Sequence, residues 1–252
     1  MSDQAAAELN NVGIAYLEEG DLKKALEFFR DALRQTMGEL RPAPPVAAVA
    51  GSASSPFDAP TSIGQASQPA APSVAAAPQQ GRRKVLSSNG NTSPFVHAQG
   101  FGVVGTPGSY SPDPLINTTV VSTIVIFNLA VVYHLKGVHE KVLCDSRLRK
   151  AYSLYRKAHL LLTDAGVFHG STGNAVVDLL SMALSNNLAH VCYEMSQYDE
   201  SRAHFDSLIR FALTVIPSRY GDSYVGSVMD NQKSNFLLNA IILHAPSLAP
   251  AA

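Results

Sequence analysis

The chain has 252 residues, with 19 basic and 20 acidic side chains and a formal net charge of −1. This balance excludes a strong general attraction to nucleic acid or to anionic membranes, so we expect neither as a partner. The 2 cysteines, Cys144 and Cys192, are too few for a disulfide framework and indicate buried thiols in a reducing compartment.

The N-terminus begins MSDQAAAELN, which has neither a basic start nor an apolar run. We therefore expect no secretory signal and an intracellular protein, cytoplasmic or nuclear. The length allows one or two domains. Because a large part of the chain has little apolar surface to bury, one compact domain is favoured.

Residues 1–41 place small and large side chains where two antiparallel helices would interlock. Gly13 leaves room for a close approach, the aromatic rings of Tyr16 and Phe29 fill the space between the helices, and Gly20-Asp21 makes the turn. The spacing resembles the tetratricopeptide repeat (TPR), a helix-turn-helix unit of about 34 residues. The residues that carry the resemblance are Gly13, Tyr16, Gly20, Ala25, Phe29 and Ala32.

The resemblance implies an all-α fold of stacked helical hairpins, a TPR-like α-solenoid. One hairpin cannot bury its own apolar face, and about three are usually needed for stability. The other hairpins must then lie elsewhere in the chain.

Residues 42–94 are rich in Pro, Ala, Ser and Gln. Such a stretch buries too little large apolar surface to offset the ordering cost of about 1–2 kcal/mol per residue, so we predict a long disordered linker, inserted after the first hairpin. Residues 95–117 form an irregular segment. It contains two extended-looking pieces, at 94–99 and 101–105, which could form a small hairpin or lie along the helical stack. Its glycines lack the Gly-Lys-Ser/Thr ending of a phosphate-binding loop.

Residues 118–245 contain two further copies of the pattern and a last helix that caps the stack. In the second copy an insertion at 138–148 separates the two halves, and we expect it to lengthen the helices or the loop between them. The matching residues are Asn128, Ala130, Tyr133, Gly137, Ala151, Tyr155 and Ala158 in repeat two, and Asn187, Ala189, Cys192, Ser196, Ser201, Phe205 and Leu208 in repeat three. The predicted helices are about Thr119–Leu135, Ser146–Thr163, Val176–Met195, Asp199–Ile216 stopped by Pro217, and Ser227–Leu243.

The stretch Thr119–Leu135 is apolar and approaches the length of a membrane span, for which about 17 to 25 residues are needed. Asn128 and His134 lie inside it, and no basic residues flank its N-terminal side. These features count against insertion. We expect a buried helix, with a membrane-attached adaptor as an alternative.

No pattern in the sequence singles out a catalytic or metal site. The motifs GxSxG, HExxH and CxxC are absent from the sequence. His190 and Glu194 share one helix face, but a lone pair supplies too few ligands for zinc. We therefore expect no enzyme activity, cofactor or metal.

The TPR resemblance implies that the first helix of each hairpin lines a groove that binds a peptide or a partner protein, so the function would be that of a protein interaction scaffold. Asparagine recurs at one inner position in all copies, and its amide can both donate to and accept from an extended peptide backbone. Alternatively, the asparagines tie neighbouring helices together. The residues mapped to the groove are Asn10, Asn11, Ile14, Leu17, Asn128, Val131, His134, Asn186, Asn187, His190 and Tyr193, with Ile124 and Phe127 beside them.

None of the mapped positions is basic. TPR proteins that bind the acidic C-terminal tails of chaperones resemble one another in carrying Lys and Arg there. We therefore expect no binding of such tails. A rival hypothesis of another class is a regulatory protein that acts through its Pro/Ala/Ser/Gln-rich segment while the helices dimerise. Deletion of residues 42–81 would separate the two, because only the rival loses partner binding.

Overall fold

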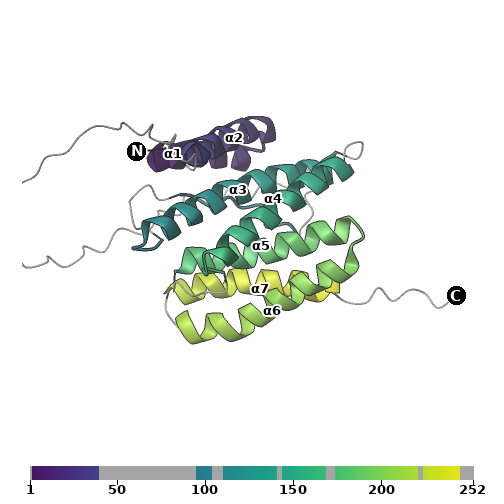
Figure 1. Ribbon diagram of the computed structural model, residues 1–252. Coiled ribbons are helices and arrows are strands. Elements are labelled where there is room, and N and C mark those ends of the chain that lie inside the picture. The colour runs from purple at the N-terminus through teal and green to yellow at the C-terminus, as the bar shows by residue number, and fades with distance from the viewer. Residues whose placement is uncertain are drawn as a thin grey trace, which may run out of the picture. The chain divides into compact units, whose positions relative to one another are not determined.

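The structure is a computed structural model that describes residues 2–39, 95–103, 110–140, 144–168, 174–220 and 224–244. All regular secondary structure in these residues is helical, so the described part of the chain is all-α (Figure 1). The predicted linker at 42–94 lies outside them. The helices are α1 (Ser2–Glu19), α2 (Leu22–Glu39), α3 (Pro114–His139), α4 (Cys144–Asp164), α5 (Ala175–Glu194), α6 (Tyr198–Tyr220) and α7 (Tyr224–His244).

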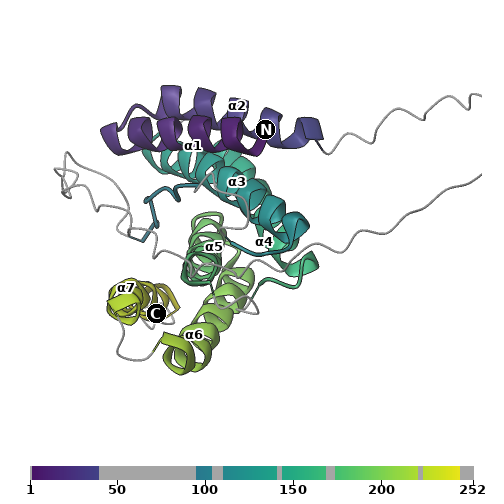
Figure 2. The same cartoon turned by 90° about the vertical axis from the view of Figure 1, so that its left-hand side faces the viewer.

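The helices pack in chain order. The pairs α1·α2, α3·α4 and α5·α6 contact each other, and each pair contacts the next through α2·α3, α4·α5 and α6·α7. Further contacts link α1 to α3, α3 to α5 and α5 to α7 (Figures 1 and 2). The odd-numbered helices therefore form one row.

The turn after α1 has the local geometry that the sequence predicts. Gly20 has a φ of 82°, its N–H donates to the Leu17 carbonyl at 3.1 Å, and the Asp21 N–H donates to the Tyr16 carbonyl at 2.9 Å. This is a Schellman ending, which favours glycine because the left-handed backbone strains other residues. Asp21 then caps α2 by accepting the Lys24 N–H at 3.0 Å.

The turn after α5 is built in the same way with a serine. Ser196 has a φ of 61°. Its N–H donates to the Tyr193 carbonyl at 2.9 Å, and the Gln197 N–H donates to the Cys192 carbonyl at 2.8 Å. Serine thus stands in a backbone conformation that glycine adopts at lower energy.

The small and large residues of the three repeated patterns occupy equivalent buried places between the helices of each pair. A Cβ atom on Gly13 would lie 2.6 Å from Cε1 of Phe29, so only glycine allows this approach of α1 to α2. In the third pair the Ser201 hydroxyl donates to the Ala189 carbonyl at 2.8 Å. The buried second-helix positions are Ala25, Phe29, Ala32, Ala151, Tyr155, Ala158, Ser201, Phe205 and Leu208.

Helix α3 is longer at both ends than the sequence predicts. It begins at Pro114 rather than near Thr119, because proline suits the first helical position, where no intrahelical N–H bond is made. Asp113 caps it by accepting the Leu115 N–H at 2.8 Å. The insertion lengthens the pair, since α3 ends at His139 and α4 begins at Cys144.

Two predictions near the C-terminus are wrong. Pro217 does not end its helix, since α6 continues to Tyr220; a proline removes one N–H donor, and the helix continues through that loss. The last helix begins at Tyr224, three residues before its predicted start at Ser227. The outer side of α7 exposes Leu238, Ile241 and Ile242, at 54%, 65% and 49% of their surfaces.

In the part of the chain that the structure describes, two helices, α3 and α5, are long and apolar enough to cross a membrane. Within their most apolar windows, 78% and 83% of the residues are buried against the rest of the protein. Packing between the helix pairs therefore accounts for their apolar character.

Candidate peptide-binding site

The extended stretch Phe95–Val103, here called the resident segment, crosses the row of odd-numbered helices. Figure 2 shows it as a dark teal trace that runs alongside α1, α3 and α5 towards α7. Of the two arrangements that the sequence allowed, it lies along the helices. Asparagine side chains of all four helices bind its backbone; we call them the asparagine row, which consists of Asn10, Asn11, Asn128, Asn186, Asn187 and Asn239.

The centre of the site is Asn128 on α3. Its Oδ1 accepts the Phe101 N–H at 2.9 Å, and its Nδ2 donates to the Phe101 carbonyl at 2.9 Å and to Oδ1 of Asn10 at 2.8 Å. Asn10 on α1 donates to the same carbonyl at 3.0 Å. Both asparagines are 0% exposed, so their amides, and not water, provide the hydrogen bonds of the Phe101 N–H and carbonyl.

Two further residues of the segment are paired in the same two-bond manner. Asn11 on α1 accepts the Val103 N–H at 2.9 Å and donates to its carbonyl at 3.0 Å. Asn187 on α5 accepts the His97 N–H at 2.8 Å and donates to its carbonyl at 3.1 Å. Each amide thus uses its donor and its acceptor on one backbone residue.

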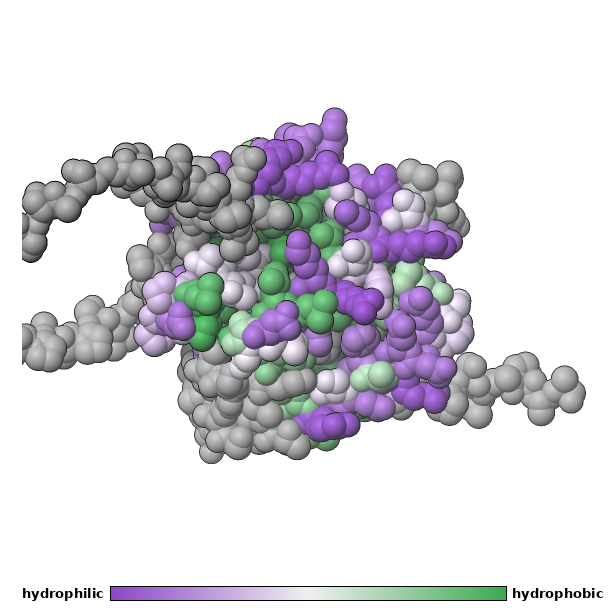
Figure 3. Space-filling model, viewed as in Figure 1, coloured by the Kyte–Doolittle hydropathy of each residue, from purple (hydrophilic) through white to green (hydrophobic). Residues whose placement is uncertain are grey.

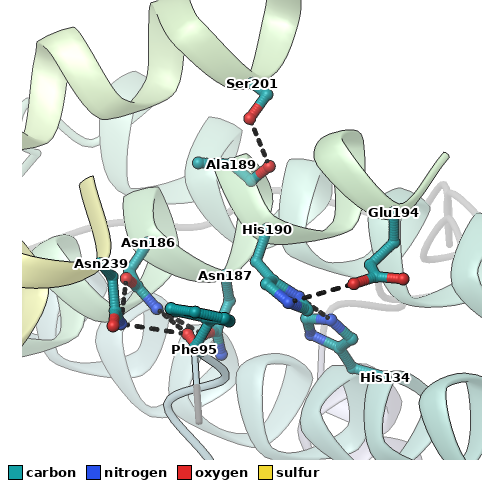
Figure 4. Close-up of polar contacts among 9 residues, drawn as sticks. All are labelled: Phe95, His134, Asn186, Asn187, Ala189, His190, Glu194, Ser201 and Asn239. Carbon is teal, nitrogen blue, oxygen red and sulfur yellow. Dashed lines mark hydrogen bonds and ion pairs between the residues drawn. The ribbon is translucent and has the colours of Figure 1, made fainter. Parts of the chain in front are cut away.

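At the N-terminal end of the segment, the described asparagine bonds go to a carbonyl, and the Phe95 ring stacks on that of His190 with centroids 6.1 Å apart. Nδ2 of Asn186 and Nδ2 of Asn239 donate to the Phe95 carbonyl, at 2.9 Å and 3.1 Å. Asn239 also donates to Oδ1 of Asn186 at 3.0 Å, so this pair repeats the geometry of Asn10 and Asn128 (Figure 4).

Sequence reasoning missed Asn239. In the other copies an alanine or glycine follows the asparagine by two residues and allows the second helix to approach. After Asn239 that position is Ile241, which is 65% exposed, and among the described residues no second helix packs on α7 as α6 packs on α5. The helix therefore does not require a small residue there, and the sequence signal is missing.

Side chains of the resident segment fill apolar positions beside the asparagine row. Phe101 packs its edge on Phe127 of α3, with ring centroids 5.1 Å apart. The His97 ring lies 5.2 Å from that of Phe236 on α7. A Cβ atom on Gly100 would lie 2.8 Å from Cγ1 of Ile14, so the backbone approaches α1 closely only because this residue is glycine.

A buried series of polar side chains, here called the polar network, runs from the asparagine row to the surface; Figure 4 shows its part formed by His134, His190 and Glu194. Nδ2 of Asn187 donates to the Tyr155 hydroxyl at 3.0 Å, and that hydroxyl lies 3.4 Å from Nδ1 of His134. Nε2 of His134 lies 2.9 Å from Nδ1 of His190. Nε2 of His190 lies 3.4 Å from Oε1 of Glu194.

The proton positions in this network follow once both histidines are neutral. If Nε2 of His190 donates to the Glu194 carboxylate, its Nδ1 accepts from Nε2 of His134, and Nδ1 of His134 then accepts from the Tyr155 hydroxyl. Asn187 donates to that hydroxyl through Nδ2.

Burial keeps the histidines in this neutral form. It lowers the pKa of His190 to about 4, and with the charge of His190 it lowers the pKa of His134 well below its usual value. Their exposed fractions are 1% and 0% with the resident segment in place, and the Phe95 ring of the segment stacks on that of His190. The geometry supports a positioning role, in which this network of polar side chains orients the Asn187 amide towards the backbone of His97.

The remaining mapped residues divide between the site and the core. Ile14 contacts the resident segment at Gly100. Leu17 and Val131 are buried among the core side chains. Tyr193 is 37% exposed and its ring pairs with that of Tyr198, so no described contact joins it to the segment.

Figure 3 shows hydrophilic side chains gathered at the top of the view, where α2 lies, and apolar surface below them. Among the described residues, no three His, Cys, Asp or Glu side chains lie together as a metal site requires.

The sequence matches no known family model, and comparisons with curated proteins and with solved structures return no significant match.

Proposed function

We propose that this chain is a non-catalytic protein interaction module, a TPR-like stack of about three hairpins with α7 at its end, which binds an extended polypeptide along the row of odd-numbered helices. The observation that carries the proposal is the two-bond pairing of Asn11, Asn128 and Asn187 with Val103, Phe101 and His97.

The repeated burial pattern supports the stacked arrangement. Equivalent positions in α2, α4 and α6 are buried, and each even-numbered helix contacts the next odd-numbered one. In a stack of this kind the first helices line one continuous surface. The asparagine row lies on those helices.

The mode of contact supports a polypeptide as the ligand. An asparagine amide that accepts an N–H and donates to a carbonyl of the same residue reads the backbone, which every peptide has. Successive pairings at His97, Phe101 and Val103 require an extended strand. A small metabolite would not match such a spacing.

The charges at the site disfavour acidic peptides as ligands. The resident segment has the sequence FVHAQGFGV, which contains no Asp, Glu, Lys or Arg. The asparagine row carries no positive charge to pair with carboxylates. Acidic chaperone tails would thus lose hydration without gaining an ion pair.

Selection of displayed 12-residue peptides tests the proposed function. It uses the full chain with Gly100→Val, because a branched side chain there meets Ile14 and weakens the hold of the resident segment on the asparagine row. We expect selected peptides to bind this variant and to lose at least tenfold in affinity when Asn128→Ala or Asn187→Ala is added, with thermal melting as the control for folding. Absence of binders, or binders indifferent to both added substitutions in folded protein, would refute it.

A further inference from the structure

We propose that the resident segment is the site's own competing ligand, and that the partner is an uncharged peptide of the same chemistry, with glycine followed by an aromatic residue, which binds by displacing it. This inference rests on the proposed function and adds the identity of the peptide class and the regulation of the site.

The resident segment occupies the whole asparagine row. The hydrogen-bonding groups of Asn128 and Asn187 that face it are used by Phe101 and His97. A second strand cannot add to these bonds, because each amide has spent its donors and acceptor. An external peptide can bind there only when the segment leaves.

Backbone pairing alone does not distinguish one peptide from another, so selectivity comes from the side chains. Gly100 has no room for a Cβ atom beside Ile14, whose Cγ1 would lie 2.8 Å away. Phe101 is 7% exposed and packs on Phe127. An incoming peptide must therefore present a residue without a side chain and then an aromatic ring.

At two positions of the segment burial favours apolar residues in an incoming peptide, and at two others the side chain is free to vary. Val96 and Val103 are 9% and 4% exposed. Gln99 and Gly102 are exposed, so their side chains are not selected by burial. The histidines behind the asparagine row are neutral, so a charged residue near them would find no counter-charge.

The resident segment and the asparagine row belong to one chain, so the segment competes as an intramolecular ligand. The effective concentration of an intramolecular ligand is on the order of 1 mM. If the intrinsic Kd for the free peptide is on the order of 10 µM, the intact chain binds it about 100-fold more weakly than a chain whose segment is disabled.

The test uses the labelled peptide FVHAQGFGV and measures fluorescence anisotropy on three forms of the full chain. These are the intact protein, Gly100→Val, which directs a branched side chain into Ile14, and Gly100→Val combined with Asn128→Ala. The control peptide FVHAQVFGV carries the same clash as the variant. We expect Gly100→Val to bind the first peptide at least tenfold more tightly than the intact chain, and the double variant and the control peptide to lose that binding.

The possible results separate this inference from the proposed function. Equal affinity of the intact chain and folded Gly100→Val would overturn the competition while leaving peptide binding in place. Absence of binding to folded Gly100→Val would overturn both proposals.

Hydrogen exchange on the intact protein covers the case in which Gly100→Val does not fold. We expect the amides of His97, Phe101 and Val103 to exchange at least tenfold faster than core amides of α3 and α5, because the segment opens without global unfolding. Equal rates would show that the segment leaves only when the protein unfolds, which would overturn its role as a displaceable ligand.

Discussion

Replacing Asn128 with alanine tests whether the asparagine row holds the fold and the segment together. Asn128→Ala removes the bonds to the Phe101 N–H, the Phe101 carbonyl and Oδ1 of Asn10. The carbonyl keeps its bond from Asn10, but the N–H and the Asn10 oxygen lose theirs in a site with no exposed surface. Each orphaned buried group costs about 1–3 kcal/mol, and alanine regains about 0.5 kcal/mol of helix propensity.

The expected loss in the free energy of unfolding is therefore about 3 kcal/mol, measured by urea denaturation. Asn239→Ala is the matched control. It removes two donor bonds from a partly buried side chain, and the Phe95 carbonyl keeps its bond from Asn186. We expect about 1 kcal/mol for it. A loss below 1 kcal/mol for Asn128→Ala, or one no larger than that of the control, would refute the reasoning.

Three further predictions concern pH, a turn and a helix contact. Burial lowers the pKa of His97 and of His190 to about 4, so below about pH 6.5 the unfolded chain binds protons that the folded chain does not. The free energy of unfolding is therefore highest above about pH 6.5 and falls by about 1.4 kcal/mol per pH unit for each histidine as the pH drops towards 4. Urea midpoints that stay constant from pH 7 to 5 would contradict this. Ser196→Gly relieves the left-handed backbone at an exposed position and should raise stability by about 1 kcal/mol in thermal melts, whereas Ser196→Ala should bring no gain. Gly13→Ala places a methyl group 2.6 Å from a ring carbon of Phe29 and should destabilise by about 1–2 kcal/mol after the gain in helix propensity; a more stable variant would show that the ring moves freely.

The helices and their turns could be predicted from the sequence because their signals are local. Gly20 and Asp21 specify a helix end and a helix start within a few residues, and the spacing from Gly13 to Phe29 specifies which faces meet. The start of α3 at Pro114 was missed although its signal is also local, since proline both ends helices and begins them. Asn239 was missed because the small residue that marks the other copies is absent.

The sequence by itself determined the helices that carry Asn10, Asn128 and Asn187, because their signals are local. Its resemblance to the TPR pattern predicted that these asparagines face a common groove. Only the tertiary structure decided what these amides bind. Phe101 is far from Asn10 along the chain, and an amide carries no preference for one backbone over another. The occupant of the site is therefore a consequence of packing, in which Gly100 and Phe101 fit against Ile14 and Phe127.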